Sequence, residues 1–422
     1  MPGKSRSFPS ILGRVLGALF VGLALTGTAL AQQPLKIGFG MSLTGPLAGN
    51  GKAALIAMEI WRDDVNAKGG ILGRKVEFVY YDDQTSPATV PGIYTKLLDV
   101  DKVDLVVSGY GTNVIAPAMP IMMQRNLVFM SLFGLNVNSK FKYDRYFQIM
   151  PAGPNPAVGW SQGFFDAAMG MNPKPKTVAL VGADAEYPAM ALEGAREHAK
   201  KTGLKIVYDK TYPPNTVDYS PIVRAIQATN PEVVFVASYP PDSAGMVRAA
   251  NEVGLRTRMF GGGLVGPQFA ALKTQLGPLL NGVVNYEFYV PDLGSKFPFL
   301  DQFLAKYQAR AVVEKVDPLG FYLPPYAYAM MQVLDQAITA TKSLDQAKLA
   351  EHIHKAEFDT YVGKVRFAGN GEWAAPRVMM TQYHGITGND VEQFKKPGRL
   401  TVLSPREYKT GELKAPYHEN KK

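Results

Sequence analysis

The sequence contains no cysteine among its 422 residues. This absence excludes a disulfide framework, a thiol nucleophile and a lipid anchor attached to cysteine. The five histidines are scattered along the chain, and the closest two, His352 and His354, point in different directions on a predicted helix. Solvated surface positions explain them better than a metal site, so we expect neither a metal nor another cofactor.

Motifs of the common enzyme classes are also missing. There is no G-x-S-x-G nucleophile elbow, and the glycines near residue 110 lack the third glycine of a dinucleotide fingerprint and the lysine of a phosphate-binding loop. The carboxylate pairs Asp63–Asp64 and Asp82–Asp83 are adjacent in sequence, so their side chains diverge on a helix or a strand. We expect no enzymatic activity.

No strong excess of charge marks the chain. Charged residues make up 19% and hydrophobic residues 46%, with a formal net charge of +9 that is spread along the sequence. Because this positive charge is small and not clustered, we expect no nucleic-acid partner. The length exceeds what one compact core accommodates, so two lobes are expected.

The N-terminus has the pattern of a secretory signal. Lys4, Arg6 and Arg14 precede the apolar run VLGALFVGLALTGTALA, which ends in a small-residue cleavage site at Ala31. The alternative is an uncleaved membrane anchor, but the run is shorter than the roughly 20 residues of a span. We therefore predict a signal peptide over 1–31 and a mature protein in the bacterial periplasm.

From residue 35 onward, short apolar runs alternate with amphipathic segments. Strands are predicted over 35–42, 75–82 and 103–108, with helices over 53–68 and 89–100 between them. Such alternation is typical of parallel strands joined by crossover helices.

A second set of elements follows three prolines, Pro151, Pro154 and Pro156. Helices are expected to begin near residues 187, 219 and 242, and a long helix is expected over 317–342. The predicted strands of this set are 177–182, 204–212, 232–239 and 258–263. The fold class is therefore α/β, with two doubly wound lobes.

The loops at the carboxyl ends of these strands are the places where ligands bind in open parallel sheets. The loop from Gly109 to Asn113 includes Tyr110, and its glycines permit close approach of a ligand to the backbone. Thr112 and Asn113 in this loop either cap a helix or contact the ligand. The next loop offers the Ser131 hydroxyl.

Three further positions complete the candidate site. Phe133, with Leu132 and Leu135, forms either an apolar wall of a cleft or part of the core. Tyr187 begins a helix as a lid or a surface cap, and Tyr239 lies in a loop stiffened by two prolines.

Three stretches resemble the branched-chain amino acid binding, or Leu/Ile/Val-binding-like, family of ABC-transporter periplasmic substrate-binding proteins. They are LKIGFGMSLTGPLAGNGKAALIAMEIWRDDVNAKGGILGRKVEFVYYDDQTSP (35–87), AEYPAMALEGAREHAKKTGLKIV (185–207) and TVDYSPIVRAIQATNPEVVFVASYPPD (216–242). The resemblance extends to about residue 400. It implies a type I periplasmic binding protein fold, in which two lobes joined by a three-crossover hinge close over one small ligand and deliver it to an inner-membrane permease.

The resemblance also implies a domain plan. Lobe one is expected over 35–150 plus about 290–355, and lobe two over 151–289 plus about 356–400. Residues 401–422 are expected to form a polar C-terminal tail, and the protein is expected to be a monomer.

Carried over loop by loop, the resemblance places Thr112, Asn113 and Ser131 where family members hold an amino acid's carboxylate and ammonium. Tyr187 and Tyr239 match tyrosines of the second lobe. Many members also carry an acidic residue in the loop that here reads GGGLVGPQ, near Gly263, but this chain has no acid there.

The hydroxyl motif of the fourth-strand loop is likewise replaced, by Leu132, Phe133 and Gly134. A buried ammonium without a carboxylate partner costs several kcal/mol, so an α-amino acid is the second choice. A carboxylate needs only amide and hydroxyl donors, which favours an aromatic or aliphatic organic acid. The alternatives to transport are a sensory ligand-binding module and, third, a hydrolytic enzyme on this scaffold.

Overall fold

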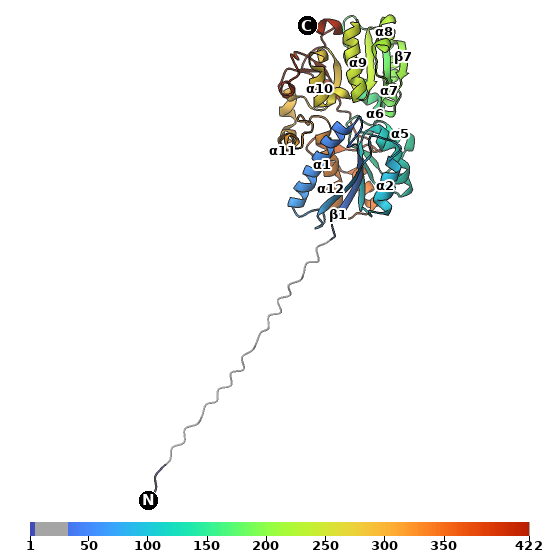
Figure 1. Cartoon of the computed structure of the whole chain (residues 1–422). Coiled ribbons are helices and arrows are strands. Elements are labelled where there is room, and N and C mark those ends of the chain that lie inside the picture. Colours follow the sequence, from blue (N-terminus) through green and yellow to red (C-terminus); the bar gives the residue numbers. More distant parts are fainter. Residues whose placement is uncertain (5–32, 422) are drawn as a thin grey trace. The chain divides into compact units, whose positions relative to one another are not determined.

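The computed structural model describes residues 1–4 and 33–421 (Figure 1). Most of the predicted signal peptide, 1–31, therefore lies outside the described residues. Residues Gln33–Lys422 form a folded unit of their own. Within the described part of the chain, no helix is both long and apolar enough to cross a membrane.

The first lobe is built on a parallel sheet, which within residues 33–421 has five strands in the order β2-β1-β3-β4-β5. Helix α1 (Ala48–Ala67) packs against the much later α12 (Leu323–Thr341), and Figure 1 shows the two in the same lobe. The strands are β1 (Leu35–Met41), β2 (Val76–Asp82), β3 (Leu105–Tyr110), β4 (Phe129–Leu132) and β5 (Tyr146–Gln148).

Shorter elements complete this lobe. The helices are α2 (Val90–Asp99), α3 (Thr112–Ile115), η1 (Ala116–Ala118), α4 (Met119–Gln124), α5 (Val137–Phe141), α11 (Pro298–Glu314) and α13 (Gln346–Lys355). A hairpin of β11 (Glu357–Thr360) and β12 (Gly363–Arg366) packs against α12.

The second lobe holds a larger sheet, with seven strands among the described residues in the order β14-β13-β10-β9-β8-β6-β7. The first five in the chain are parallel. At one edge β13 pairs antiparallel with β10, and β14 pairs antiparallel with β13. They are β6 (Thr177–Ala183), β7 (Lys205–Tyr212), β8 (Val233–Ser238), β9 (Met259–Leu264), β10 (Val284–Glu287), β13 (Met379–Tyr383) and β14 (Leu400–Ser404).

Helices cover both faces of this sheet, so every residue of β8 is buried, as expected for a central parallel strand. The helices are α6 (Pro156–Met169), α7 (Glu186–Thr202), α8 (Ser220–Ala228), α9 (Pro240–Val253) and α10 (Ala270–Leu276). Single-turn helices are η2 (Gly266–Gln268), η3 (Gly277–Leu280), η5 (Val391–Lys395), η6 (Arg406–Tyr408) and η7 (Tyr417–Lys421).

Within residues 33–421 the chain crosses between the lobes three times. The crossings lie between β5 and α6, between β10 and α11, where η4 (Pro291–Lys296) sits, and between β12 and β13. This is the predicted type I arrangement of two doubly wound lobes joined by a three-segment hinge.

Some boundaries differ from the predictions. The hairpin over 357–366 packs on α12 and extends lobe one past residue 355. Strand β14 pairs with β13, so the stretch predicted as a polar tail over 401–422 contributes to the sheet of lobe two. Helix α12 begins at Leu323 instead of residue 317, because Pro324 and Pro325 fit only the first turn of a helix.

Candidate functional site

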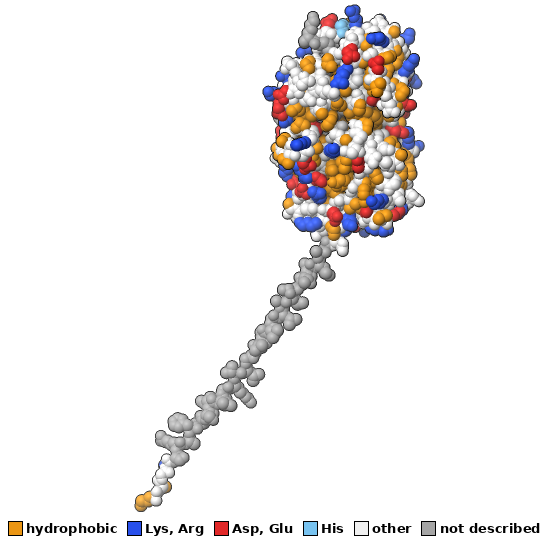
Figure 2. All heavy atoms as spheres, viewed as in Figure 1, with side chains coloured by type: hydrophobic (Ala, Val, Ile, Leu, Met, Phe, Trp, Pro, Cys, Tyr) orange, Lys and Arg blue, Asp and Glu red, His pale blue; other side chains and the backbone are white. Residues whose placement is uncertain are grey.

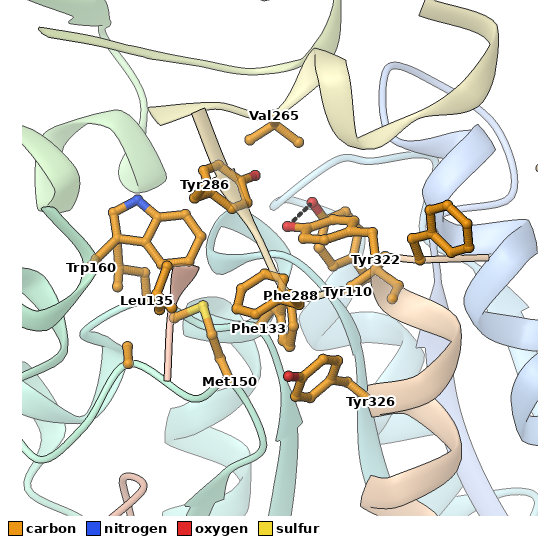
Figure 3. Packing of buried hydrophobic residues seen from close by; sticks show 14 of the residues in the cluster. Tyr110, Phe133, Leu135, Met150, Trp160, Val265, Tyr286, Phe288, Tyr322 and Tyr326 are labelled. Atoms are coloured by element: carbon orange, nitrogen blue, oxygen red, sulfur yellow. Dashed lines mark hydrogen bonds between the residues drawn. The ribbon is translucent and has the colours of Figure 1, made fainter. Parts of the chain in front are cut away.

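A small cavity lies where the carboxyl ends of both sheets meet (Figure 3). Lobe one and the hinge contribute Tyr110, Gly111, Thr112, Phe133, Leu135, Met150 and Tyr322, and lobe two contributes Trp160, Tyr187, Tyr239 and Val265. The cavity measures about 20 Å³, room for roughly one water molecule. A larger ligand therefore requires the cleft to widen.

Five of the predicted site residues line this cavity, namely Tyr110, Thr112, Phe133, Tyr187 and Tyr239. These residues lie at or after the ends of β3, β4, β6 and β8. The carboxyl ends of strands from both lobes therefore meet at this cavity, which is where ligands bind in open parallel sheets.

Asn113 lies beside the cavity and joins the lobes. Its Oδ1 accepts a hydrogen bond of 3.2 Å from the Tyr239 hydroxyl. At the rim, Lys140 of lobe one and Glu186 of lobe two form an exposed ion pair at 3.5 Å, which contributes little to stability. These contacts place the lobes against one another.

Ser131, Gly134 and Gly263 are not among the residues that line the cavity. The Ser131 Oγ accepts a hydrogen bond from the Tyr146 hydroxyl at 2.9 Å, and the Gly134 carbonyl accepts one from Gln148 Nε2 at 2.7 Å. The Gly263 carbonyl accepts a hydrogen bond of 2.8 Å from the Tyr187 hydroxyl. These three residues support the walls from behind.

Thr112 lines the cavity, but its hydroxyl oxygen has a structural role. Thr112 Oγ1 accepts a hydrogen bond of 3.0 Å from the backbone N–H of Leu135. This contact ties the loop after β3 to the loop after β4. The residue that caps the short helix α3 is Gly111, with a φ of 107° that favours glycine.

Sequence reasoning missed the aromatic residues that the hinge segments and α6 bring to the cavity. The rings of Trp160 and Tyr286 are tilted against each other with 4.3 Å between centroids, and the ring of Tyr322 lies 5.3 Å from that of Phe133. Phe288 packs on Tyr322 and Tyr326 behind the cavity. Figure 3 shows these rings as one cluster that surrounds the space between the lobes.

The polar groups of the cavity are neutral. Among the described residues, none that lines it carries a charged side chain, and six are aromatic. The hydroxyls of Tyr110 and Tyr322 lie 3.1 Å apart in a hydrogen bond. Burial raises the pKa of Tyr110, Tyr286 and Tyr322 well above the ordinary value, so all three remain protonated donors.

The described residues contain no cluster of three or more acidic, histidine or cysteine side chains that suits a metal ion. Outside the cavity, Figure 2 shows basic and acidic side chains interspersed on the visible face, with apolar side chains gathered toward its middle. What the cavity offers is an aromatic enclosure with neutral hydrogen-bond donors.

Comparison with known proteins decides the family. The model of the periplasmic binding protein family matches residues 34–385.

The chain belongs to this family.

A solute-binding role follows for this periplasmic binding protein. The Leu/Ile/Val-binding protein homolog 8 of Brucella suis is 26% identical over 353 residues, which cover 79% of this chain and 87% of the relative. The Leu/Ile/Val-binding protein of Escherichia coli is 24% identical and covers 86% of this chain and 94% of the relative. Both names describe binding, not catalysis.

Solved structures share the fold of this binding protein. A leucine-binding protein from Thermotoga maritima is 18% identical with a TM-score of 0.72, covering 87% of this chain and 97% of its own. A solute-binding protein from R. palustris in complex with benzoate is 16% identical with a TM-score of 0.71, covering 88% and 97%. The same architecture therefore accommodates both kinds of solute.

Proposed function

We propose that this protein is the periplasmic solute-binding component of an ABC importer, that its lobes close on a small aromatic or aliphatic carboxylate, and that it delivers this ligand to an inner-membrane permease. The observation that carries the proposal is the composition of the cavity, with six aromatic side chains and no charged one among the described residues that line it. Aromatic walls with a few polar groups are typical of sites for small, largely apolar ligands.

The absence of a lining carboxylate argues against an α-amino acid. The loop near Gly263 contains no acid, and the Gly263 carbonyl is already bonded to Tyr187. An ammonium enclosed here has no anionic partner, and such burial costs several kcal/mol, enough to abolish micromolar affinity. The fold neighbour in complex with benzoate is consistent with an acid ligand.

An amino acid is the second candidate, because two named relatives are a Leu/Ile/Val-binding protein and its homolog. A thermal-melting screen separates the candidates, using benzoate, 4-hydroxybenzoate, hexanoate, leucine and isoleucine. A ligand at about a hundred times its dissociation constant stabilises the folded state by about 2.7 kcal/mol. We expect an acid to raise the melting temperature. Stabilisation by leucine or isoleucine alone would overturn the proposal.

Transport is tested separately from binding. Cells that lack the gene should lose uptake of the labelled acid, and a copy of the gene should restore it. A sensory module would leave uptake unchanged and alter gene expression instead. Unchanged uptake would therefore refute the importer role even if the acid binds.

A further inference from the structure

Two hydrogen-bond donors beside the cavity have no partner. The indole Nε1 of Trp160 and the hydroxyl of Tyr286 are buried, and neither makes a hydrogen bond to any atom among the described residues. The side chains are 2% and 0% exposed, so bulk water does not reach them. A buried polar group without a partner costs roughly 1–3 kcal/mol, which marks such groups as candidates for a ligand contact.

The two donors lie in one place. The rings of Trp160 and Tyr286 are 4.3 Å apart, and the ring of Tyr322 lies 6.1 Å from that of Tyr286. In Figure 3 the Tyr286 hydroxyl points toward the hydrogen-bonded hydroxyls of Tyr110 and Tyr322. Because that pair shares one hydrogen bond, one of its two O–H groups is left to donate elsewhere.

Neighbouring groups do not supply the missing partner. The hydroxyl of Tyr187 lies near the Trp160 indole, and that of Tyr322 lies near the Tyr286 hydroxyl, but neither contact has the geometry of a hydrogen bond. The Tyr187 hydroxyl donates its own proton to the Gly263 carbonyl. The cavity has room for roughly one water molecule, which a ligand would displace.

The Trp160 indole determines whether the missing partner is a hydrogen-bond donor or an acceptor. A tryptophan N–H donates and never accepts, so the group that completes it is an acceptor. An ammonium group is excluded at this position, and a carboxylate suits it, because two oxygens can accept from several neutral donors at once. Hydrogen bonds to an ionised group are roughly twice as strong as those between neutral groups.

The predicted alternative, the turn at Thr112 and Asn113, holds no buried side-chain atom without a partner. Thr112 Oγ1 accepts from the Leu135 N–H, and Asn113 Oδ1 accepts from the Tyr239 hydroxyl. These contacts hold loops and lobes together, so both side chains have a structural role. The Thr112 O–H and the Asn113 N–H groups can still donate, and the Thr112→Val variant below tests this turn as the competing site.

We infer that the carboxylate of the ligand is held by Trp160 Nε1, the Tyr286 hydroxyl and the free O–H of the Tyr110–Tyr322 pair. The inference rests on the proposed function and adds the place and orientation of the ligand. Trp160 and Tyr286 belong to lobe two, whereas Tyr110 and Tyr322 belong to lobe one. The carboxylate therefore bridges the lobes, and the body of the ligand lies among the remaining rings.

Isothermal titration with benzoate tests this assignment on the full mature chain. Trp160→Phe and Tyr286→Phe keep the rings and remove one donor each, and we expect either to weaken benzoate binding about 10- to 100-fold. Trp373→Phe is the matched control, because the Trp373 indole is also buried and unpartnered but does not line the cavity. Melting curves of the free variants verify that they fold.

The outcomes are distinct. Near wild-type benzoate affinity in both variants, with a loss in Thr112→Val instead, would overturn the assignment and leave the proposed function standing. If the wild-type protein binds no acid but binds leucine, the proposed function fails. Titration of the same two variants with leucine then tests the assignment, because the leucine carboxylate needs the same donors. Weaker leucine binding would support the assignment, and unchanged leucine affinity would overturn it.

Discussion

Gly49 and Phe269 meet across the two lobes, and the phenyl ring occupies the space that a side chain at position 49 would fill. A Cβ atom on Gly49 would lie only 2.3 Å from Cζ of Phe269. Gly49 is in the first turn of α1 in lobe one, and Phe269 precedes α10 in lobe two. A side chain at position 49 would therefore have to displace this ring before the lobes could meet as they do.

A side chain at position 49 should hold the lobes apart. We expect Gly49→Val to weaken ligand binding about ten-fold or more, because overpacking costs about 1–3 kcal/mol and each 1.4 kcal/mol is a factor of ten. Small-angle scattering of the liganded variant should show a larger radius of gyration than the liganded wild type.

The control for this variant is Gly92→Val, because a Cβ at Gly92 on α2 meets nothing within 4 Å. Adding Phe269→Ala to Gly49→Val removes the ring and should restore closure. Full compaction of the single variant with ligand would contradict the expectation.

Loss of the Tyr239 hydroxyl should destabilise the closed form and leave the fold unaffected. Tyr239→Phe removes the hydrogen bond to Asn113 Oδ1, which is worth about 1 kcal/mol, so ligand affinity should fall about five-fold. Titration calorimetry measures the change. Tyr208→Phe, on an edge strand of lobe two, is the matched control and should bind as the wild type does.

Asp242 should make stability depend on pH. Burial raises the pKa of Asp242 from 3.8 to about 6, although hydrogen bonds from Tyr219 and Tyr212 oppose this rise. Because the folded state binds the proton more tightly than the unfolded chain, ionisation opposes folding. The cost is absent below pH 3.8 and complete above pH 6, and it reaches up to about 3 kcal/mol.

We therefore expect the melting temperature of Asp242→Asn, relative to wild type, to rise as the pH increases from 4 to 7. Asp184→Asn replaces an exposed carboxylate and should show no such trend. A difference between Asp242→Asn and wild type that stays constant across this range would refute the expectation.

A buried ion pair in lobe two predicts a large loss of stability when one partner is removed. Lys273 Nζ lies 3.2 Å from Glu287 Oε1, and the two side chains are 3% and 1% exposed. Lys273→Met leaves the carboxylate uncompensated and should cost about 3–5 kcal/mol in urea unfolding at pH 7.5.

The double variant Lys273→Met/Glu287→Gln should recover most of that loss, because it removes the charge and keeps an acceptor for the Tyr383 hydroxyl. The loss in the single variant should shrink at low pH, since burial raises the pKa of Glu287 and a proton then neutralises it. Equal stability of the single and double variants at pH 7.5 would argue against this account.

Regular periodicity made the lobes predictable. Strands such as Leu35–Met41 and Val233–Ser238 lie where apolar runs placed them, and helix α7 begins one residue before Tyr187. The loops at the ends of these strands supplied five of the residues that line the cavity. Local sequence was sufficient there because the αβ repeat fixes which loops meet.

The other aromatic residues in and beside the cavity depend on long-range topology. Trp160 lies within a helix, Tyr286 within a strand and Tyr322 before a proline-rich helix start, so none of them follows the end of a parallel strand in an αβ repeat. The prolines near residue 151 concealed helix α6, since Pro156 begins that helix. The Ser131 hydroxyl and the Gly134 carbonyl do not line the cavity, because they accept hydrogen bonds from Tyr146 and Gln148 on the next strand.

The position of Trp160 gives the protein an optical property. The sequence has three tryptophans, and Trp61 stacks on Phe78 in lobe one while Trp373 lies in the third crossing. Among the described residues, Trp160 is the only tryptophan that lines the cavity. Its fluorescence should therefore respond directly when a solute enters, so the unlabelled protein can report its own occupancy.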